Sequence, residues 1–252
     1  MKPITYWLTA EELQGIYTAD YWNNLDEEKR KATWIEDGDY GKCFSHLKSK
    51  GLWSEYHLAQ NYIENHKGND FVVADLAAGI GWGSALMSKL SKVKEIHAVE
   101  ISKHRIERLF PECVKMLEGD SAKISRYVGS FYNLDFESHR FDIVYLSCAF
   151  HHAQNPFALL TEVDRVLKPG GRVILVGEQY MGAWRRIRRF VSHFMKNKSL
   201  TFNFRKLFPA DDLLGDHYYR ICDYYFMFET LKYTTIHSFD GRSNVVYIAD
   251  KP

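Results

Sequence analysis

Beyond residue 70 the chain alternates short apolar runs with longer stretches in which apolar residues recur at helical spacing. The apolar runs are rich in β-branched residues and lie at 71–77, 95–102, 124–130, 141–149 and 171–178. Amphipathic stretches occur at 82–90, 104–117 and 156–168. We expect Pro111 to break or kink the second of these and the glycines of LKPGG to end the third. Buried strands that alternate with helices are typical of a parallel sheet covered on both faces.

The two ends of the chain do not follow this alternation. An Asp240-Gly241 dipeptide separates two strand-like runs near the C-terminus, which predicts a hairpin. The predicted fold class is therefore α/β: a Rossmann-like, doubly wound, mostly parallel seven-stranded sheet with an antiparallel C-terminal hairpin and helical lid segments. We divide the chain into a helical, aromatic-rich N-terminal cap (1–66), the Rossmann-like core (67–178), a helical lid insertion (179–232) and the hairpin (233–252).

Composition and charge narrow the classes of partner. Of its residues 46% are hydrophobic and 26% are charged, a composition typical of globular proteins. The net charge of +1 gives no reason to expect nucleic acid as a partner. Its four cysteines form no CxxC pair, so we expect neither a metal site nor a disulfide framework, and a cytoplasmic location. We also expect no signal peptide and no membrane span, because no apolar run is long enough.

The sequence VVADLAAGIGWGS, residues 72–84, places glycines directly after the first strand. Gly79 and Gly81 let the backbone approach a nucleotide, but Asp75 would oppose the pyrophosphate of a dinucleotide with a like charge. A cationic ligand would gain from Asp75 instead. S-adenosylmethionine carries an ammonium and a sulfonium and no phosphate, and Glu100 after the second strand suits its ribose. The acids therefore favour the methyl donor over NAD, although Asp75 as a simple cap of the turn is an alternative.

At these residues the chain resembles the class I S-adenosylmethionine-dependent methyltransferases. The resemblance extends from about residue 71 to 178, over the segments ADLAAGIGWGS, HAVEIS, YVGSFYNLDF, FDIVYLSCAFHHAQNP and EVDRVLKPGGRVILVGE in that order, and it includes the terminal hairpin. Two positions depart from the family pattern: Ala77 stands where glycine is usual, and Ser130 where many members have an acid. The resemblance implies a cofactor site formed by Asp75, Ala77, Gly79, Gly81, Glu100, Ile101, Ser130, Phe131 and Leu146, with Ile101 and Phe131 as adenine walls.

Histidines are the first candidates for catalysis, because a hydroxyl or amine acceptor must lose a proton near neutral pH. His151 and His152 follow the fourth strand of the core, where the resemblance places methyl transfer, and His217 is a third candidate. One of the pair can equally be a packing residue under the loop. Substrate contacts are expected from Glu178, Tyr180, Arg185 and Tyr219. Asp216 is expected to cap a helix or to contact substrate.

The segment WRRIRRFVSHFMKNK, residues 184–198, is an amphipathic helix with four arginines within five residues. A solvated basic face over a packed apolar stripe is the first interpretation. The second is a channel for an anionic substrate, and the third a helix on a membrane surface.

The predicted function is methyl transfer from S-adenosylmethionine to an O or N atom of a small polar biosynthetic metabolite, phosphorylated or sugar-like. An RNA or protein methyltransferase is the alternative, against which the balanced net charge argues. A non-catalytic partner subunit that binds S-adenosylmethionine is a third hypothesis. The oligomeric state is left open.

Overall fold

The computed structural model describes residues 1–252 except 15, 17–33, 180, 209–215 and 240–243. Its strands are β1 (Ile4–Tyr6), β2 (Phe71–Leu76), β3 (Val93–Glu100), β4 (Ile124–Val128), β5 (Phe141–Ser147), β6 (Leu167–Gln179), β7 (Thr234–Phe239) and β8 (Asn244–Asp250). Its helices are α1 (Ala10–Gln14), α4 (Tyr40–Ser49), α5 (Leu52–Glu64), α6 (Trp82–Met87), α7 (Phe110–Met116), α8 (Pro156–Val166), α9 (Ala183–Asn197), α10 (Phe204–Leu207) and α11 (Ile221–Glu229), with a π-helix at Arg105–Leu109 and a 3₁₀ turn at Phe150–His152.

The described strands form one sheet in the order β1-β4-β3-β2-β5-β6-β8-β7. All neighbours pair in parallel except β8, which is antiparallel to both β6 and β7. From β2, near the middle of the sheet, the chain winds outward first through β3 to β4 and then through β5 toward the opposite edge. This confirms the predicted doubly wound, mostly parallel fold with an antiparallel hairpin, although the Asp240-Gly241 turn itself lies outside the described residues.

The sheet has eight strands where the sequence predicts seven. The additional strand is β1, which pairs with β4 at one edge, and Trp7 N–H continues the ladder to the carbonyl of Val128 at 3.0 Å. We assigned this segment to a helical cap. Three residues are too few to display an alternating pattern, so only the unpaired edge of β4 decides that they are a strand.

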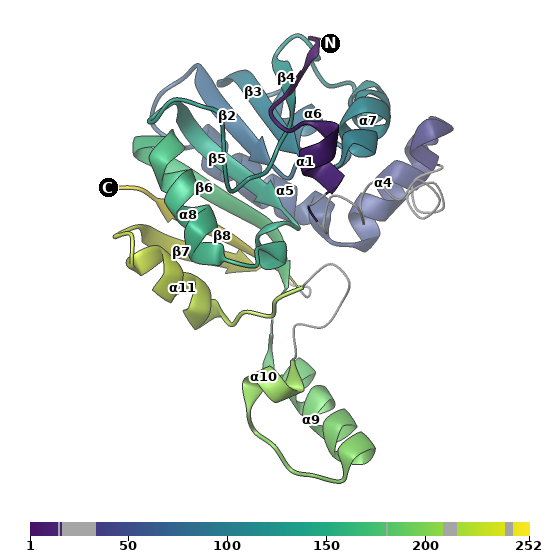
Figure 1. Cartoon of the computed structure of the whole chain (residues 1–252), viewed down its shortest axis with the longest axis vertical. Coiled ribbons are helices and arrows are strands. Elements are labelled where there is room, and N and C mark those ends of the chain that lie inside the picture. The colour runs from purple at the N-terminus through teal and green to yellow at the C-terminus, as the bar shows by residue number, and fades with distance from the viewer. Residues whose placement is uncertain (15, 17–33, 180, 209–215, 240–243) are drawn as a thin grey trace.

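Helices cover both faces of the sheet (Figure 1). In β5 the side chains alternate between the faces from Ile143 to Leu146: Ile143 and Tyr145 pack in the cluster with α4, α5, α6 and α7, while Val144 and Leu146 pack in the cluster with α8 and α11. Because both faces are buried, the strands read as continuous apolar runs rather than as alternating ones.

Local signals fix the helix ends. Asn155 caps α8 by accepting from Ala158 N–H at 3.0 Å, and the helix ends at Val166, directly before LKPGG. Pro111 does not break its helix: it lies in the first turn of α7, where a missing N–H is tolerated. Among the described residues, no helix is long and apolar enough to cross a membrane.

Candidate active site

The turn after β2 holds Asp75 away from solvent. The side chain is 2% exposed, and its Oδ2 accepts from the Ser84 hydroxyl at 2.6 Å. Burial raises the pKa of Asp75 to about 7, the hydrogen bonds from Ser84 oppose the shift, and the nearby charge of Glu100 adds to it. The bond to Ser84, in the first turn of α6, fits the capping role. Burial disfavours the ionised carboxylate, and a cationic ligand in the cavity would favour it and lower its pKa.

The backbone of this turn is left-handed at three positions. Ala77, Gly79 and Gly81 have φ of 53°, 56° and 83°. Ala77 therefore adopts a conformation that favours glycine, which accounts for glycine being usual at this position in the family. A Cβ added to Gly81 would lie 2.4 Å from the Phe110 ring, so here both φ and space require glycine.

Glu100, at the end of β3, is fixed by two backbone donors. Gly79 N–H donates to Oε2 at 2.7 Å, and Ser102 N–H donates to Oε1 at 2.8 Å. These bonds hold the carboxylate at the edge of the glycine turn and keep it from rotating. A fixed acceptor pair of this kind suits two neighbouring hydroxyl groups, as on a ribose.

A cavity of about 1200 Å³ opens at the carboxyl edge of the sheet. Most of the predicted site residues line it: Asp75, Ala77, Gly79, Glu100, Ile101, Ser130, Phe131, His151, His152 and Arg185. The cap contributes Trp34, His46 and Lys50, which the sequence analysis did not single out. The cofactor side and the histidine side of the predicted site therefore face one common space.

Other predicted residues are not among the described lining residues. Leu146 is fully buried in the core, and Gly81 shapes the turn from behind, so their contacts with a cofactor stay predictions. Tyr180 lies outside the described residues. Tyr219 packs on Phe150 and Tyr224 beneath the histidines.

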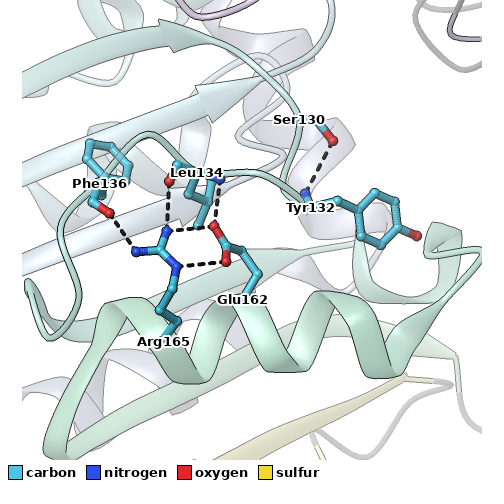
Figure 2. A network of polar contacts seen from close by, with 6 residues as sticks. All are labelled: Ser130, Tyr132, Leu134, Phe136, Glu162 and Arg165. Atoms are coloured by element: carbon cyan, nitrogen blue, oxygen red, sulfur yellow. Dashed lines mark hydrogen bonds and ion pairs between the residues drawn. The ribbon is translucent and has the colours of Figure 1, made fainter.

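The loop after β4, which carries Ser130 and Phe131, is held from α8 (Figure 2). Arg165 donates to the carbonyls of Leu134 and Phe136, each at 2.7 Å, and Glu162 accepts from Leu134 N–H at 2.7 Å. Arg165 and Glu162 also bind each other, at 2.7 Å and 2.9 Å. The ion pair thus fixes one wall of the cavity without touching it. Sequence reasoning missed this role, because i and i+3 charges on a helix usually indicate only a surface pair.

The two adjacent histidines each meet a carboxylate from a different part of the chain. His151 Nδ1 lies 3.1 Å from Glu178 Oε2, and His152 Nδ1 lies 2.8 Å from Asp216 Oδ1. The backbone N–H of His217 joins this group by donating to the carbonyl of His151 at 2.8 Å. Asp216 does not cap a helix, since α11 begins at Ile221 with Arg220 at its N-cap.

Glu178 is fully buried at the end of β6, where it accepts from the Tyr224 hydroxyl at 2.5 Å as well as facing His151. Burial raises the pKa of this carboxyl, but the positive charge of His151 and the hydrogen bonds from His151 and Tyr224 outweigh it, so the pKa lies below its usual value. Glu178 therefore stays ionised and orients His151. The structure places it behind the histidine rather than in the cavity, so its predicted contact with substrate would require a rearrangement.

The same group has the donor set for a metal ion. Ligand atoms of His151, His152 and Asp216 lie within 4.8 Å of one another, and two imidazoles with one carboxylate suit several divalent transition metals. The sequence analysis expected no metal. The spacing of Asp216 from the histidines in sequence gives no sign that they meet.

Comparison with known proteins identifies the domain. Residues 74–175 match the methyltransferase domain family. The chain carries a class I S-adenosylmethionine-dependent methyltransferase domain. The matched methyltransferase segment contains Asp75, Glu100, His151 and the ion pair of Figure 2, so it includes the acids that the sequence predicts for the cofactor.

Two curated relatives match part of this chain. A sterol 24-C-methyltransferase of Neurospora crassa is 28% identical over 56% of this chain and 38% of its own length. A sarcosine/dimethylglycine N-methyltransferase of Aphanothece halophytica is 32% identical over 39% of this chain and 35% of its own length. The chain thus matches well under half the length of either relative.

A solved S-adenosylmethionine-dependent methyltransferase from Aquifex aeolicus has the same fold, with a TM-score of 0.54 and 14% identity. The superposition covers 91% of this chain and 99% of that one. The methyltransferase fold therefore extends over nearly the whole chain, including regions outside the matched family segment.

Proposed function

We propose that the protein transfers a methyl group from S-adenosylmethionine to an O or N atom of a small polar metabolite, with phosphorylated and sugar-like compounds as first candidates. The observation that carries the proposal is the single cavity that Asp75 and Glu100 share with His151 and His152. When bound, S-adenosylmethionine supplies an electrophilic methyl group. The chain contributes alignment and proton removal, and alignment alone accounts for much of the acceleration in an in-line displacement.

Asp75 and Glu100 are the proposed cofactor ligands. Asp75 would bind the cationic methionine part and Glu100 the ribose, with Ile101 and Phe131 on either side of the adenine. The fit rests on the buried carboxyl of Asp75, whose pKa burial raises, and on the two backbone donors that fix Glu100. An ionised Asp75 would repel a pyrophosphate, which argues against NAD in this turn.

His152 is the proposed general base. Its side chain is 22% exposed against 8% for His151, so it is the more accessible of the two from the cavity. Asp216 orients the His152 ring and stabilises the positive charge that it gains with the acceptor's proton. His151, held by Glu178, is the proposed positioning residue beside it.

Kinetics of His152→Gln test this assignment. We expect kcat to fall about 10²- to 10⁴-fold, the range for loss of general base catalysis, while the Kd for S-adenosylmethionine stays within about twofold. Asp216→Asn should give a smaller loss. His66→Gln, at a half-buried histidine that is not among the lining residues, is the matched control. Loss of turnover on EDTA treatment, restored by a divalent metal, would instead make the histidines metal ligands.

The acceptor class is proposed from charge. Arg185 lines the cavity at the start of a helix rich in arginine, which favours an anionic acceptor. The relatives named above act on a sterol and on sarcosine or dimethylglycine, so they give no common acceptor. Turnover to S-adenosylhomocysteine with a panel of sugar phosphates, polar amines and bulk RNA separates the proposal from an RNA methyltransferase. A non-catalytic partner subunit would bind S-adenosylmethionine and turn over with none of them.

We further propose that the cap (1–66), which contributes Trp34, His46 and Lys50 to the lining, is the lid of the cavity, that the insertion (179–232) borders it through Arg185, and that the protein works in the cytoplasm. Thermal melting with S-adenosylmethionine, S-adenosylhomocysteine and NAD in parallel is the first experiment. A ligand at about 100 times its Kd adds roughly 2.7 kcal/mol to the free energy of unfolding. A shift with NAD alone would contradict the assignment of Asp75.

A further inference from the structure

Helix α9 (Ala183–Asn197) presents its apolar side to solvent. Trp184 is 82% exposed, and Ile187, Val191, Phe194 and Met195 on the same side of the helix are all exposed. No residue of α9 is buried. The first interpretation of this segment, a packed apolar stripe under a solvated basic face, is therefore wrong. In Figure 1, α9 and α10 project together away from the sheet as an arm, which we define as residues 181–208.

The arm is held together by its own small core. Met181, Leu207 and Phe208 are buried there with Phe190, Phe204 and Tyr218 packed against them. Arg189 lies over the rings of Phe208 and Tyr218, at 5.6 Å and 5.9 Å from their centroids. One side of α9 thus packs inward on α10, and this packing fixes which side faces out. The outward apolar side is a consequence of how the arm is built.

The segment that returns from α9 extends the exposed apolar surface. Phe202 is 86% exposed while stacking on Phe190 at 5.1 Å between centroids, and Leu200 is 69% exposed. A soluble chain normally buries side chains of this size, and contiguous exposed apolar groups mark an interaction surface. The arm therefore offers two adjoining apolar elements, the outer side of α9 and the return segment.

The charge of the arm selects the partner. Residues 180–210 contain lysines and arginines but no aspartate or glutamate. The described part of the chain supplies no acidic partner for Arg186, Arg188 or Lys196, all of which are exposed. A second copy of this arm would bring like charges together, which opposes self-association through this surface. An anionic partner would be attracted instead.

We propose that the arm docks on an anionic lipid bilayer surface. The outer side of α9, with Trp184 and Phe194, would enter the boundary between headgroups and acyl chains, and Phe202 would follow from the return segment. Arg188 and the other exposed cations would meet lipid phosphates. Tryptophan and phenylalanine on one side, with Lys and Arg on the other, is the composition of helices that lie in a membrane interface. The cytoplasmic leaflet carries the required negative charge.

Docking would also orient the active site. Arg185, in the first turn of α9, lines the cavity, so the helix that meets the lipid also borders the proposed site of methyl transfer. Docking does not depend on which compound accepts the methyl group, because a bilayer-bound arm leaves the cavity able to take either a soluble or a lipid-linked compound.

Flotation of the full chain with lipid vesicles tests the proposal. We expect binding to vesicles of 70% phosphatidylcholine and 30% phosphatidylglycerol, weakened by 0.5 M salt, and little binding to pure phosphatidylcholine. Trp184→Ser with Phe194→Ser should reduce partitioning about tenfold or more, and so should Arg186→Glu with Arg188→Glu. Phe226→Ser, at an exposed phenylalanine of α11, is the matched control and should bind as the unmodified chain does.

The melting temperature and S-adenosylmethionine binding of each variant show whether it is folded. We expect both to be unchanged, because none of the altered side chains is buried. Absence of binding to anionic vesicles, or equal binding to neutral ones, would overturn the proposal. So would binding that the arm variants leave unchanged. Because vesicle binding needs no methyl acceptor, its failure is distinguishable from failure of the proposed enzymatic function.

Discussion

The cavity and the arm place polar and apolar side chains in opposite ways. At the cavity, Asp75, Glu100 and Glu178 are carboxylates buried at strand ends, each held by hydrogen bonds. On the arm, Trp184 and Phe202 are large apolar side chains held in water. Both arrangements are unfavourable for the isolated protein, since a buried charge and an exposed aromatic surface each raise its free energy.

The two regions therefore require different partners from outside the chain. A buried carboxylate with a raised pKa is relieved by a cation small enough to enter the cavity. An exposed apolar surface flanked by cations is relieved by an extended anionic partner. Substitutions of the buried cavity residues should therefore affect ligand binding and folding, and substitutions of the exposed apolar side chains of the arm should affect neither.

Asp75→Asn should have the largest effect. Loss of the carboxylate removes the charge that a cationic ligand needs, and we expect S-adenosylmethionine affinity to fall at least about 100-fold by calorimetry, as for a broken buried ion pair. Stability should move the other way. The pKa of about 7 in the folded protein lies above the usual value of an aspartate in an unfolded chain, so the stability that protonated Asp75 contributes is full below about pH 4 and is lost as the pH rises through 7.

The asparagine variant should therefore gain up to about 4 kcal/mol of stability at pH 8 and little at pH 4, measured by denaturant unfolding. A variant that instead loses stability at pH 8 and keeps its affinity would show that Asp75 is only a cap. That result would remove the main distinction between the cavity and an ordinary buried turn.

Gly81→Ala comes next. The added methyl group would meet the Phe110 ring at 2.4 Å in a left-handed backbone, and we expect a loss of about 3 kcal/mol, or roughly 6–12 °C in Tm. Gly170→Ala is the matched control, because its φ is 73° but nothing lies within 4 Å of the new Cβ. It should cost about 1 kcal/mol. Equal losses in the two variants would mean that strain alone, and not the approach of α7, requires glycine at the turn.

Arg165→Met should have a moderate effect at a distance. It removes the guanidinium donor from the carbonyls of Leu134 and Phe136 and leaves the carboxylate of Glu162 with only the backbone donor Leu134 N–H among the bonds described above, which we expect to cost about 2 kcal/mol of stability. S-adenosylmethionine affinity should fall by about tenfold, because the wall of the cavity loosens. Arg165→Lys keeps the positive charge but not the forked geometry of the guanidinium, so its stability and its affinity for S-adenosylmethionine should lie between those of the unmodified chain and those of Arg165→Met. Unchanged affinity would separate this loop from the cofactor site.

Trp184→Ser should have the smallest effect on the isolated protein. The ring is already 82% exposed, so the free energy of unfolding should change by no more than about 0.5 kcal/mol. Trp82→Ser is the contrast, since that ring is buried beside the cavity and its loss should cost about 3–5 kcal/mol. A large drop in Tm for the Trp184 variant would mean that the arm is packed in solution, and the comparison with the cavity would fail.

Local patterns predicted most of the fold and the positions of the two acids that we propose as cofactor ligands. Apolar runs and glycine turns depend on near neighbours, so the strands β2 to β6, the end of α8 and the placement of Asp75 and Glu100 could be read in order along the chain. The edge strand β1 could not, because its three residues become a strand only when β4 offers unpaired backbone groups.

The amino-acid sequence alone predicts the doubly wound sheet. It also predicts that Asp75 lies at the end of β2, before the glycine turn, and that Glu100 ends β3. The partners of the two histidines follow from the fold, because Glu178 and Asp216 are distant from them in sequence and come close only when the chain folds. The fold also decided which side of α9 faces solvent. An amphipathic pattern indicates that one side of a helix is apolar and the other polar. What covers the apolar side depends on where the helix packs, and the described structure leaves that side of α9 exposed.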